Sequence, residues 1–276
     1  MLTAAHQSVI DHSAVIRLCP METNLLQFVE SATLDPTGRE SGTRQIYDAV
    51  LDHSATLDCG NFTRIHTRDL EILFDEYDAR FFDDRIRKSL GGIPLHFRLS
   101  NRMTTAGGKT TRLTRRDKSA PASNEYEIAA STTLLFQCFG DDDHRPITAC
   151  GITCRDRLEA LQRVMEHELI HLTELLLWNT SSCSQGRFHR IAGRFFGHTE
   201  HKHQLITPRE RAFVKFGVKR GDRVRFRFHG VDHTGIVNRV TKRATVLVED
   251  PQGVQYSNGI RYKKYYVPVE ILEGVD

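Results

Sequence analysis

The sequence predicts an α+β fold in two parts: a body that combines helices with a small antiparallel sheet, and a small all-β module at the C-terminal end. Apolar residues recur at helical spacing over 70–82 and again over 153–178. Three segments between these helices alternate apolar and polar residues as half-buried strands do: 95–99, 109–113 and 126–130. After Pro208 the pattern changes to short strands, which marks the start of the module.

The length of 276 residues allows one sizeable core plus a smaller module. Residues 1–60 show no sustained apolar period, and 33–42 is rich in turn formers, so we expect an N-terminal extension with one short helix near 25–29. Residues 61–207 then form the body, and residues 208–276 form the module.

The first half of the body contains a packing helix that starts near Thr67 and ends before Gly91. The three alternating segments that follow form the expected antiparallel sheet. Residues 103–111 allow two interpretations: an edge strand that aligns an extended substrate, with Lys109 near a carbonyl or a phosphate, or a plain glycine-containing hairpin. The Asp-rich segment 141–146 lacks the ligand spacing of a calcium site, so we expect a solvated loop.

A long helix is the central element of the body. Thr153 with Asp156 three residues later resembles a capping box, and helix-compatible residues continue from there to Trp178. A second helix is expected to begin at Ser184 as N-cap and to stop at Gly197.

The C-terminal module is expected to consist of four or five short strands. In the first strand, Val224 and its apolar neighbours alternate with arginines. The remaining expected strands are 235–240, 245–249 and 262–269, with a turn at 250–253. This number of strands in about 60 residues suggests a small SH3-like barrel.

Composition places the chain in the cytoplasm and gives it no membrane partner. No apolar run approaches the roughly 20 residues that span a bilayer, and the N-terminus lacks a basic segment that leads into an apolar one. Six cysteines stand at irregular spacing in a chain too large to need disulfides. Cys150 and Cys154 have no second Cys/His pair at zinc-finger spacing, so we interpret them as small buried residues.

His167, Glu168 and His171 form an HExxH motif on the long helix. Residues four apart lie on one helical face, so both imidazoles can bind one ion. The motif is typical of zinc peptidases, in which the metal activates water and the glutamate acts as general base. Two histidines and a glutamate can also occur at this spacing by chance. Here, however, a loop and a second helix follow the motif and can supply a third ligand. Glu174 is expected to support the ligands or to face solvent.

Residues 67–207 resemble the SprT-like zinc metalloprotease family, the Spartan-related group. It rests on the run 73–112, which includes Phe81-Phe82, 98–103 and 107–109, and on the segments 167–178 and 188–205. It implies a zincin-like metalloprotease domain, zinc ligation by His167 and His171, catalysis by Glu168, and action on proteins attached to DNA.

The third zinc ligand is where the sequence departs from this family. At the position of the family's third histidine the chain has Ser184, which is not a usual zinc ligand. Cys183 is adjacent, and His203 can return to the metal if 197–203 is extended. These two candidates remain equal, and a two-histidine or degenerate site remains the third possibility. His189 and His198 are expected to point elsewhere, His198 as a capping or packing residue.

The module is basic, with fourteen Lys and Arg against eight Asp and Glu over 208–276, a balance of +6. Positive charge interleaved with tyrosines suits binding to a phosphate backbone and to stacked bases. A solvated strand face that covers core tyrosines would have the same sequence pattern. The candidate nucleic-acid-binding residues are Arg225, Arg227, Lys242, Arg243, Lys263 and Lys264.

These observations lead to one main hypothesis and two alternatives. The main hypothesis is an endopeptidase with one Zn²⁺ that cleaves proteins bound or crosslinked to DNA, so its partners are a protein substrate and DNA. The first alternative is a zinc peptidase with substrates unrelated to DNA. The second is a nucleic-acid-binding protein with a structural or degenerate zinc site.

Overall fold

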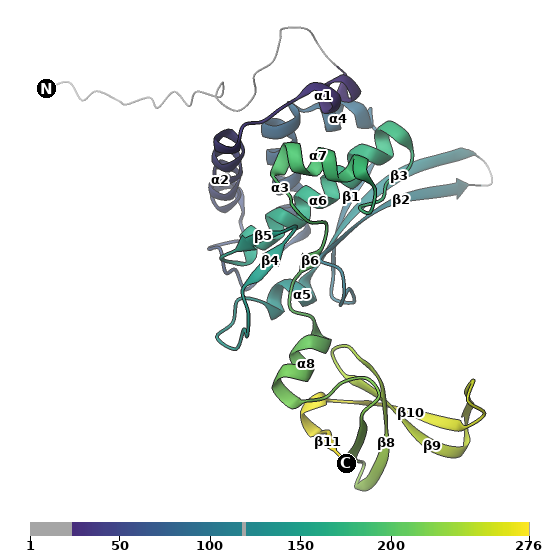
Figure 1. Ribbon diagram of the computed structural model, residues 1–276. Helices are drawn as coiled ribbons and strands as arrows, with labels where there is room; N and C mark the ends of the chain where they lie inside the picture. Colours follow the sequence, from purple (N-terminus) through teal and green to yellow (C-terminus); the bar gives the residue numbers. More distant parts are fainter. Residues whose placement is uncertain (1–23, 118–119, 276) are drawn as a thin grey trace, which may run out of the picture.

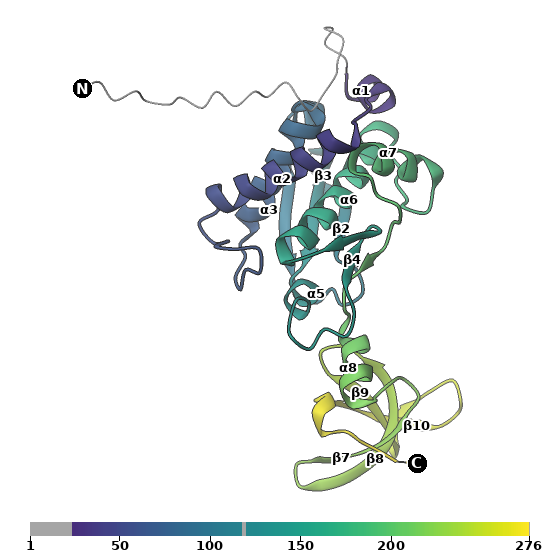
Figure 2. The same cartoon turned by 60° about the vertical axis from the view of Figure 1, so that its left-hand side comes forward.

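The computed structural model describes residues 24–117 and 120–275 and has two lobes (Figures 1 and 2). The larger lobe contains helices and two small sheets, and the smaller C-terminal lobe contains one sheet and one α-helix. Each lobe has its own apolar core. The predicted α+β class is therefore confirmed. No described helix is long and apolar enough to cross a membrane.

The N-terminal segment contributes more to the body than the sequence indicated. Helix α1 spans Leu25–Ser31, close to the expected short helix, but helix α2 spans Pro36–His53 and was missed. The segment 33–42 reads as turn-rich, yet Asp35 caps α2 and Pro36 occupies its first turn. The buried stripe of α2 contains two glycines, which a search for apolar periodicity does not count: Gly38, Gly42, Ile46 and Val50. Both helices pack in the core of the body.

The packing helix of the body has three parts. Helix α3 spans Thr67–Tyr77, a π-helical turn spans Asp78–Phe82, and helix α4 spans Arg85–Leu90. The wider turn brings the consecutive rings of Phe81 and Phe82 into the same core. Phe82 stacks on Phe195 of the later helix α7, with ring centroids 4.9 Å apart.

The first sheet contains the three expected strands, but it is mixed. Strands β1 (Leu95–Ser100), β2 (Gly108–Asp117) and β3 (Ala120–Ser131) lie in the order β1-β3-β2. β2 and β3 form an antiparallel hairpin, whereas β1 pairs with the far side of β3 in parallel. The expectation of a purely antiparallel sheet was wrong, because spacing alone does not show on which side of a hairpin the preceding strand lies. β2 is left as an edge strand.

A second small sheet lies beside the long helix. Its strands β4 (Ile147–Ala149), β5 (Ile152–Cys154) and β6 (His203–Gln204) lie in the order β5-β4-β6, after the short helix α5 (Thr132–Gln137). All pairs in this sheet are antiparallel. The segment 141–146 is irregular, as expected for a loop.

Helix α6 (Arg157–Trp178) is the expected long helix and is buried along most of its length. Its N-cap is Asp156, which accepts a hydrogen bond from the Glu159 N–H, whereas Thr153 lies in β5. Helix α7 spans Gly186–Phe196 with Gln185 as N-cap, so its cap lies one residue later than the expected Ser184. It ends at Gly197, whose φ of 69° is favourable only for glycine.

The C-terminal module begins with a helix that the sequence reading missed, α8 (Pro208–Phe216), capped by Thr207. Strands β7 (Arg223–Phe228), β8 (Val231–Val240), β9 (Ala244–Gln255) and β10 (Arg261–Val267), followed by β11 (Glu273–Gly274), form one antiparallel sheet. Its order is β10-β9-β8-β7-β11, and among the described residues no pairing between β10 and β11 closes a barrel. The expected turn at 250–253 is a bulge within β9, in which Asp250 accepts a hydrogen bond from the Gln252 N–H.

Candidate metal centre

The two histidines of the HExxH motif point at one position. Nε2 of His167 and Nε2 of His171 lie 3.1 Å apart. Two nitrogens bound to one tetrahedral zinc at 2.0–2.1 Å would be about 3.3 Å apart, so the pair fits a shared ion. Phe188 of α7 packs against both rings and limits their movement.

The structure brings both candidate third ligands to these histidines. A ligand atom of Cys183 lies within 4.8 Å of those of His167 and His171, and all three belong to one group that could hold a metal. The ring of His203 lies with its centroid 4.5 Å from that of His167, and its buried Nε2 has no hydrogen-bond partner among the described residues. The short distances between its ligand atom and those of both histidines favour Cys183 as the third ligand. The unpartnered Nε2 favours His203 for the same role.

Cys150 belongs to a second group with His167 and His203, and the sequence reading missed it. Its Sγ lies 3.8 Å from Nδ1 of His167, and burial raises the pKa of this thiol. Its backbone also anchors the chain that carries His203, because the Cys150 carbonyl accepts bonds from Thr199 and Glu200. In the sequence, the only local signal at Cys150 is the following Gly151, which indicates a turn and not a metal site. The contact depends on strand pairing between distant segments, which sequence spacing does not reveal.

A chain of hydrogen bonds orients His171 from behind. Nδ1 of His171 lies 2.6 Å from Oγ of Ser181, and this hydroxyl donates to the buried carboxylate of Glu174 at 2.6 Å. Arg187 of α7 binds the second oxygen of Glu174 at 2.7 Å. A ring nitrogen fixed in this way leaves the other nitrogen free for a metal, so Glu174 supports a ligand, the first of its two expected roles.

Burial keeps the three histidines neutral. It lowers the pKa of His203 to about 3, an effect to which the neighbouring His198 and His171 contribute. Burial also lowers the pKa of His167, with further lowering by His203 and His171, and it lowers the pKa of His171. Neutral imidazole is the form that binds metals.

Glu168 lies beside the histidines and is almost fully buried. Thr110 of β2 donates to its Oε2 at 2.8 Å and to its backbone carbonyl at 3.0 Å. Burial raises the pKa of Glu168 to about 8, against the hydrogen bonds from Thr110, which favour the ionised form. A divalent cation beside the carboxylate would also favour that form.

The glycines before Lys109 allow β2 to approach α6 closely. A Cβ on Gly108 would lie 2.6 Å from Oε1 of Glu168, and one on Gly107 would lie 3.0 Å from Nδ1 of His203. Both glycines are therefore required by the packing of the site and not only by a turn.

His198 takes part in a buried network next to the site. Its Nε2 lies 2.7 Å from the carboxylate of Glu166, which also binds Tyr77 and Arg163. This agrees with the expected packing role. His189 lies on the outer side of α7, and its ring contacts those of Phe188 and His201.

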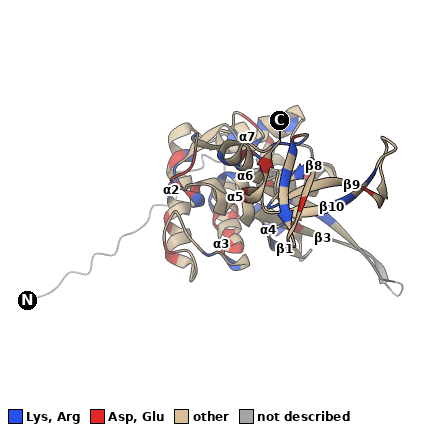
Figure 3. Ribbon diagram, turned by 90° about the horizontal axis from the view of Figure 1, so that it is seen from below, with Lys and Arg blue, Asp and Glu red and all other residues tan. Residues whose placement is uncertain are grey.

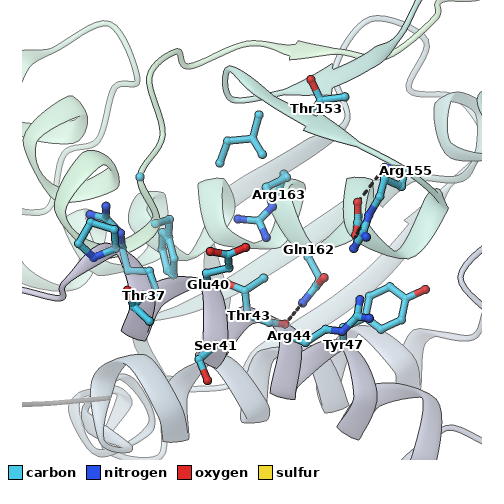
Figure 4. Close-up of a pocket in the computed structure, with 16 residues that line it drawn as sticks. Thr37, Glu40, Ser41, Thr43, Arg44, Tyr47, Thr153, Arg155, Gln162 and Arg163 are labelled. Carbon is cyan, nitrogen blue, oxygen red and sulfur yellow. Dashed lines mark hydrogen bonds and ion pairs between the residues drawn. The ribbon is translucent and has the colours of Figure 1, made fainter. Parts of the chain in front are cut away.

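The site opens into a cavity of about 780 Å³ between β2, the end of α6 and the segment 201–210. Lys109 and Arg112 of β2 line it together with His167, Glu168 and His171. A larger cavity of about 940 Å³ lies elsewhere, between α2 and the first half of α6 (Figure 4). Its walls carry both signs of charge, and neither candidate metal-ligand group found among the described residues lies there.

The candidate nucleic-acid residues are exposed but do not form one surface. Figure 3 shows Lys and Arg spread over several strands of the module. Arg225 is paired with Glu273 at 2.7 Å, and Arg227 lies 3.9 Å from Asp232. Lys263 and Lys264 are consecutive on β10, so their side chains point to opposite faces. The other two are exposed at the turn between β8 and β9: Lys242 and Arg243.

Two of the three tyrosines of β10 are packing residues. Tyr262 is buried, with its hydroxyl bound to Asn258, and Tyr265 packs on Phe226. Tyr266 alone of the three is strongly exposed.

Comparison of the chain with protein-family models, with curated proteins and with solved structures finds no match, so its function has to be argued from the geometry of this site.

Proposed function

We propose that the chain is a zinc-dependent endopeptidase that acts on proteins bound or crosslinked to DNA. The observation that carries the proposal is the meeting of two neutral histidines and one buried glutamate on the wall of an open cavity. Cys183 and His203 both lie close enough to supply a third ligand.

Each residue of the site has a role in this proposal. When bound, the zinc ion polarises a peptide carbonyl and activates water. Glu168 accepts the proton, and the Thr110 hydroxyl holds its carboxylate in place. β2 is an edge strand beside the cavity, which suits an extended substrate that pairs with its backbone. The resemblance of residues 67–207 to the SprT-like family, which implies a zincin-like domain, is the sequence-based support for this assignment.

The substitution Glu168→Gln tests the chemistry. It removes the base but none of the proposed ligands, so the variant should keep its zinc and lose at least 100-fold in cleavage rate. Casein and histone cleavage with and without DNA, together with zinc content, are the measurements. Normal cleavage by the variant would exclude Glu168 as the base. Equal cleavage with and without DNA would exclude the DNA-linked part of the proposal.

A structural zinc site is the second candidate, and one observation favours it. His167, His171 and Cys183 form one donor group, and His203 lies beside His167 as a fourth donor. A tetrahedral ion that takes all four has no open position for water, which is the arrangement of a structural site. In that case the wild-type protein would hold zinc and cleave neither substrate.

A further inference from the structure

Another cavity, of about 520 Å³, lies where the body meets the module, and we call it the junction cleft. One wall is the loop between β1 and β2, and the other walls come from the start of α8, the turn before β7 and strand β8. Its lining residues are Thr104, Thr105, Thr207, Arg209, Arg220, Asn238, Arg239, Val240 and Thr241.

Three arginines from three different elements meet in this cleft. Arg209 lies on α8, Arg220 in the turn before β7, and Arg239 on β8. All three are exposed, and none has an ion pair or side-chain hydrogen bond with any residue that the structure describes. No carboxylate lines the cleft. Its positive charge is therefore not compensated by the protein.

Several other arginines at the junction and in the module have acidic partners, whereas the three in the cleft have none among the described residues. Arg145 is bound to Glu210, Arg211 to Asp143, and Arg225 to Glu273. Lone cations that share one concave site attract an anionic ligand, because the surrounding protein focuses their field. The ligand of this cleft must supply negative charge.

The junction cleft is continuous with the metal cavity. Thr105 and Thr207 line both spaces. The loop that carries Thr105 continues into Gly107 and Gly108, which pack against His203 and Glu168. A chain bound in the cleft would therefore lie next to the cavity of the proposed peptidase.

The cleft exists only when the two lobes are docked. Helix α8 is fixed to the 141–146 loop of the body, because Glu210 binds Arg145 and His144 and Arg211 binds Asp143. All three arginines belong to the module, in which Ala212 of α8 packs in the core. The body adds the wall that contains Thr104 and Thr105, so the closed shape of the cleft depends on both lobes.

We propose that the junction cleft binds the phosphodiester backbone of a nucleic-acid strand and holds it beside the metal cavity; the role of that placement rests on the proposed peptidase function. Arginine forks match phosphate oxygens, and the threonine hydroxyls and the Asn238 amide add further donors. No aromatic residue lines the cleft, so it makes no base stacks and binding is independent of sequence.

Binding of the full-length protein to fluorescein-labelled oligonucleotides, measured by anisotropy over a range of salt concentrations, tests this site. The triple variant Arg209→Ala, Arg220→Ala, Arg239→Ala should reduce the log–log salt slope on duplex by up to about 2.7, at about 0.9 for each lost phosphate contact. Arg225→Ala with Arg227→Ala is the matched control and should change the slope little, because Glu273 and Asp232 already lie beside these arginines. A triple arginine-to-lysine variant keeps the charge and should retain most of the slope.

A triple alanine variant that binds like wild type, or a control that loses as much, would overturn the proposal. An acidic peptide that displaces the oligonucleotide from wild type, but not from the triple variant, would also overturn it, because the cleft would then hold polypeptide. Far-UV circular dichroism of each variant, compared with wild type, verifies that the strands of the module, which carries all the substituted arginines, are still formed. Because binding is measured without cleavage, an inactive wild-type protein would contradict the proposed function and leave this test intact.

Discussion

The body and the module place their polar residues in opposite ways. Every buried charged or polar side chain among the described residues lies in the body. Several of them lie on the HExxH helix itself, such as Glu166, Glu168 and Glu174. The module buries only apolar residues and tyrosine and carries its charges in solvent. Metal chemistry needs side chains held by fixed partners, whereas attraction of a polyanion needs charge that has no partner. The difference is consistent with the proposal that the body carries the chemistry and the module binds a polyanion by charge.

The largest expected effect separates the two cores. Phe82→Ala removes a fully buried ring that stacks on Phe195 and should cost the body about 3–5 kcal/mol. Trp178 lies in the body, so its fluorescence during urea unfolding reports that lobe. Phe226→Ala in the module is the matched control and should leave this transition unchanged. If Phe226→Ala shifts it equally, the lobes unfold as one unit and the comparison fails.

The third ligand is the next largest effect. Cys183→Ala should weaken zinc binding by more than about 100-fold, beyond the 10–100-fold typical of outer partners, because Cys183 groups with both helix histidines. His203→Ala should weaken it less. Competition with a chromogenic chelator gives both affinities.

The opposite order of these two variants would place the ion in the group of Cys150, His167 and His203. Full zinc affinity in both variants would show that neither residue is a ligand.

A smaller loss is expected from the support behind His171. Ser181→Ala removes the hydroxyl between His171 and Glu174 and should lower zinc affinity by about 10–100-fold, since the ring loses its fixed orientation. Ser182→Ala is the control, because the Ser182 hydroxyl contacts only Ser184 among the described residues. Equal effects of the two changes would argue that loop packing matters and the hydrogen bond does not.

The smallest effect concerns the contact between the lobes. The hydrogen bonds with Arg145 lower the pKa of Glu210, although its burial acts in the opposite direction. The pair therefore stabilises docking above the unfolded carboxyl pKa, and its contribution is lost as pH falls through the lower folded value. A double-mutant cycle with Glu210→Gln and Arg145→Gln should give at most about 1 kcal/mol at pH 7, and this coupling should decrease as pH falls below the unfolded carboxyl pKa. A coupling that does not change with pH would rule out the ion pair as its source.

Some elements were visible in the sequence because their signals are local. The apolar period over 70–82, the alternation in β7 and the stop at Gly197 each depend on residues within one element. Helix α2 was missed because two glycines, Gly38 and Gly42, occupy its buried stripe, and a search for apolar periodicity does not count glycine. Helix α8 was missed because a capping box and nine residues are a weak signal beside a series of strands.

The sequence by itself determined that His167 and His171 share one face of a helix, with Glu168 next to the first of them, because a spacing of four matches the helical repeat. Only the tertiary structure decided what meets them. Cys150, Cys183 and His203 come from separate segments. Strand pairing brings Cys150 and His203 to His167, and the loop after α6 brings Cys183 to both His167 and His171. The three arginines of the junction cleft likewise come from separate elements and converge only through the packing of α8 and β8 in the module. Contacts between distant segments depend on which surfaces pack together, and residue spacing along the chain carries no record of that choice.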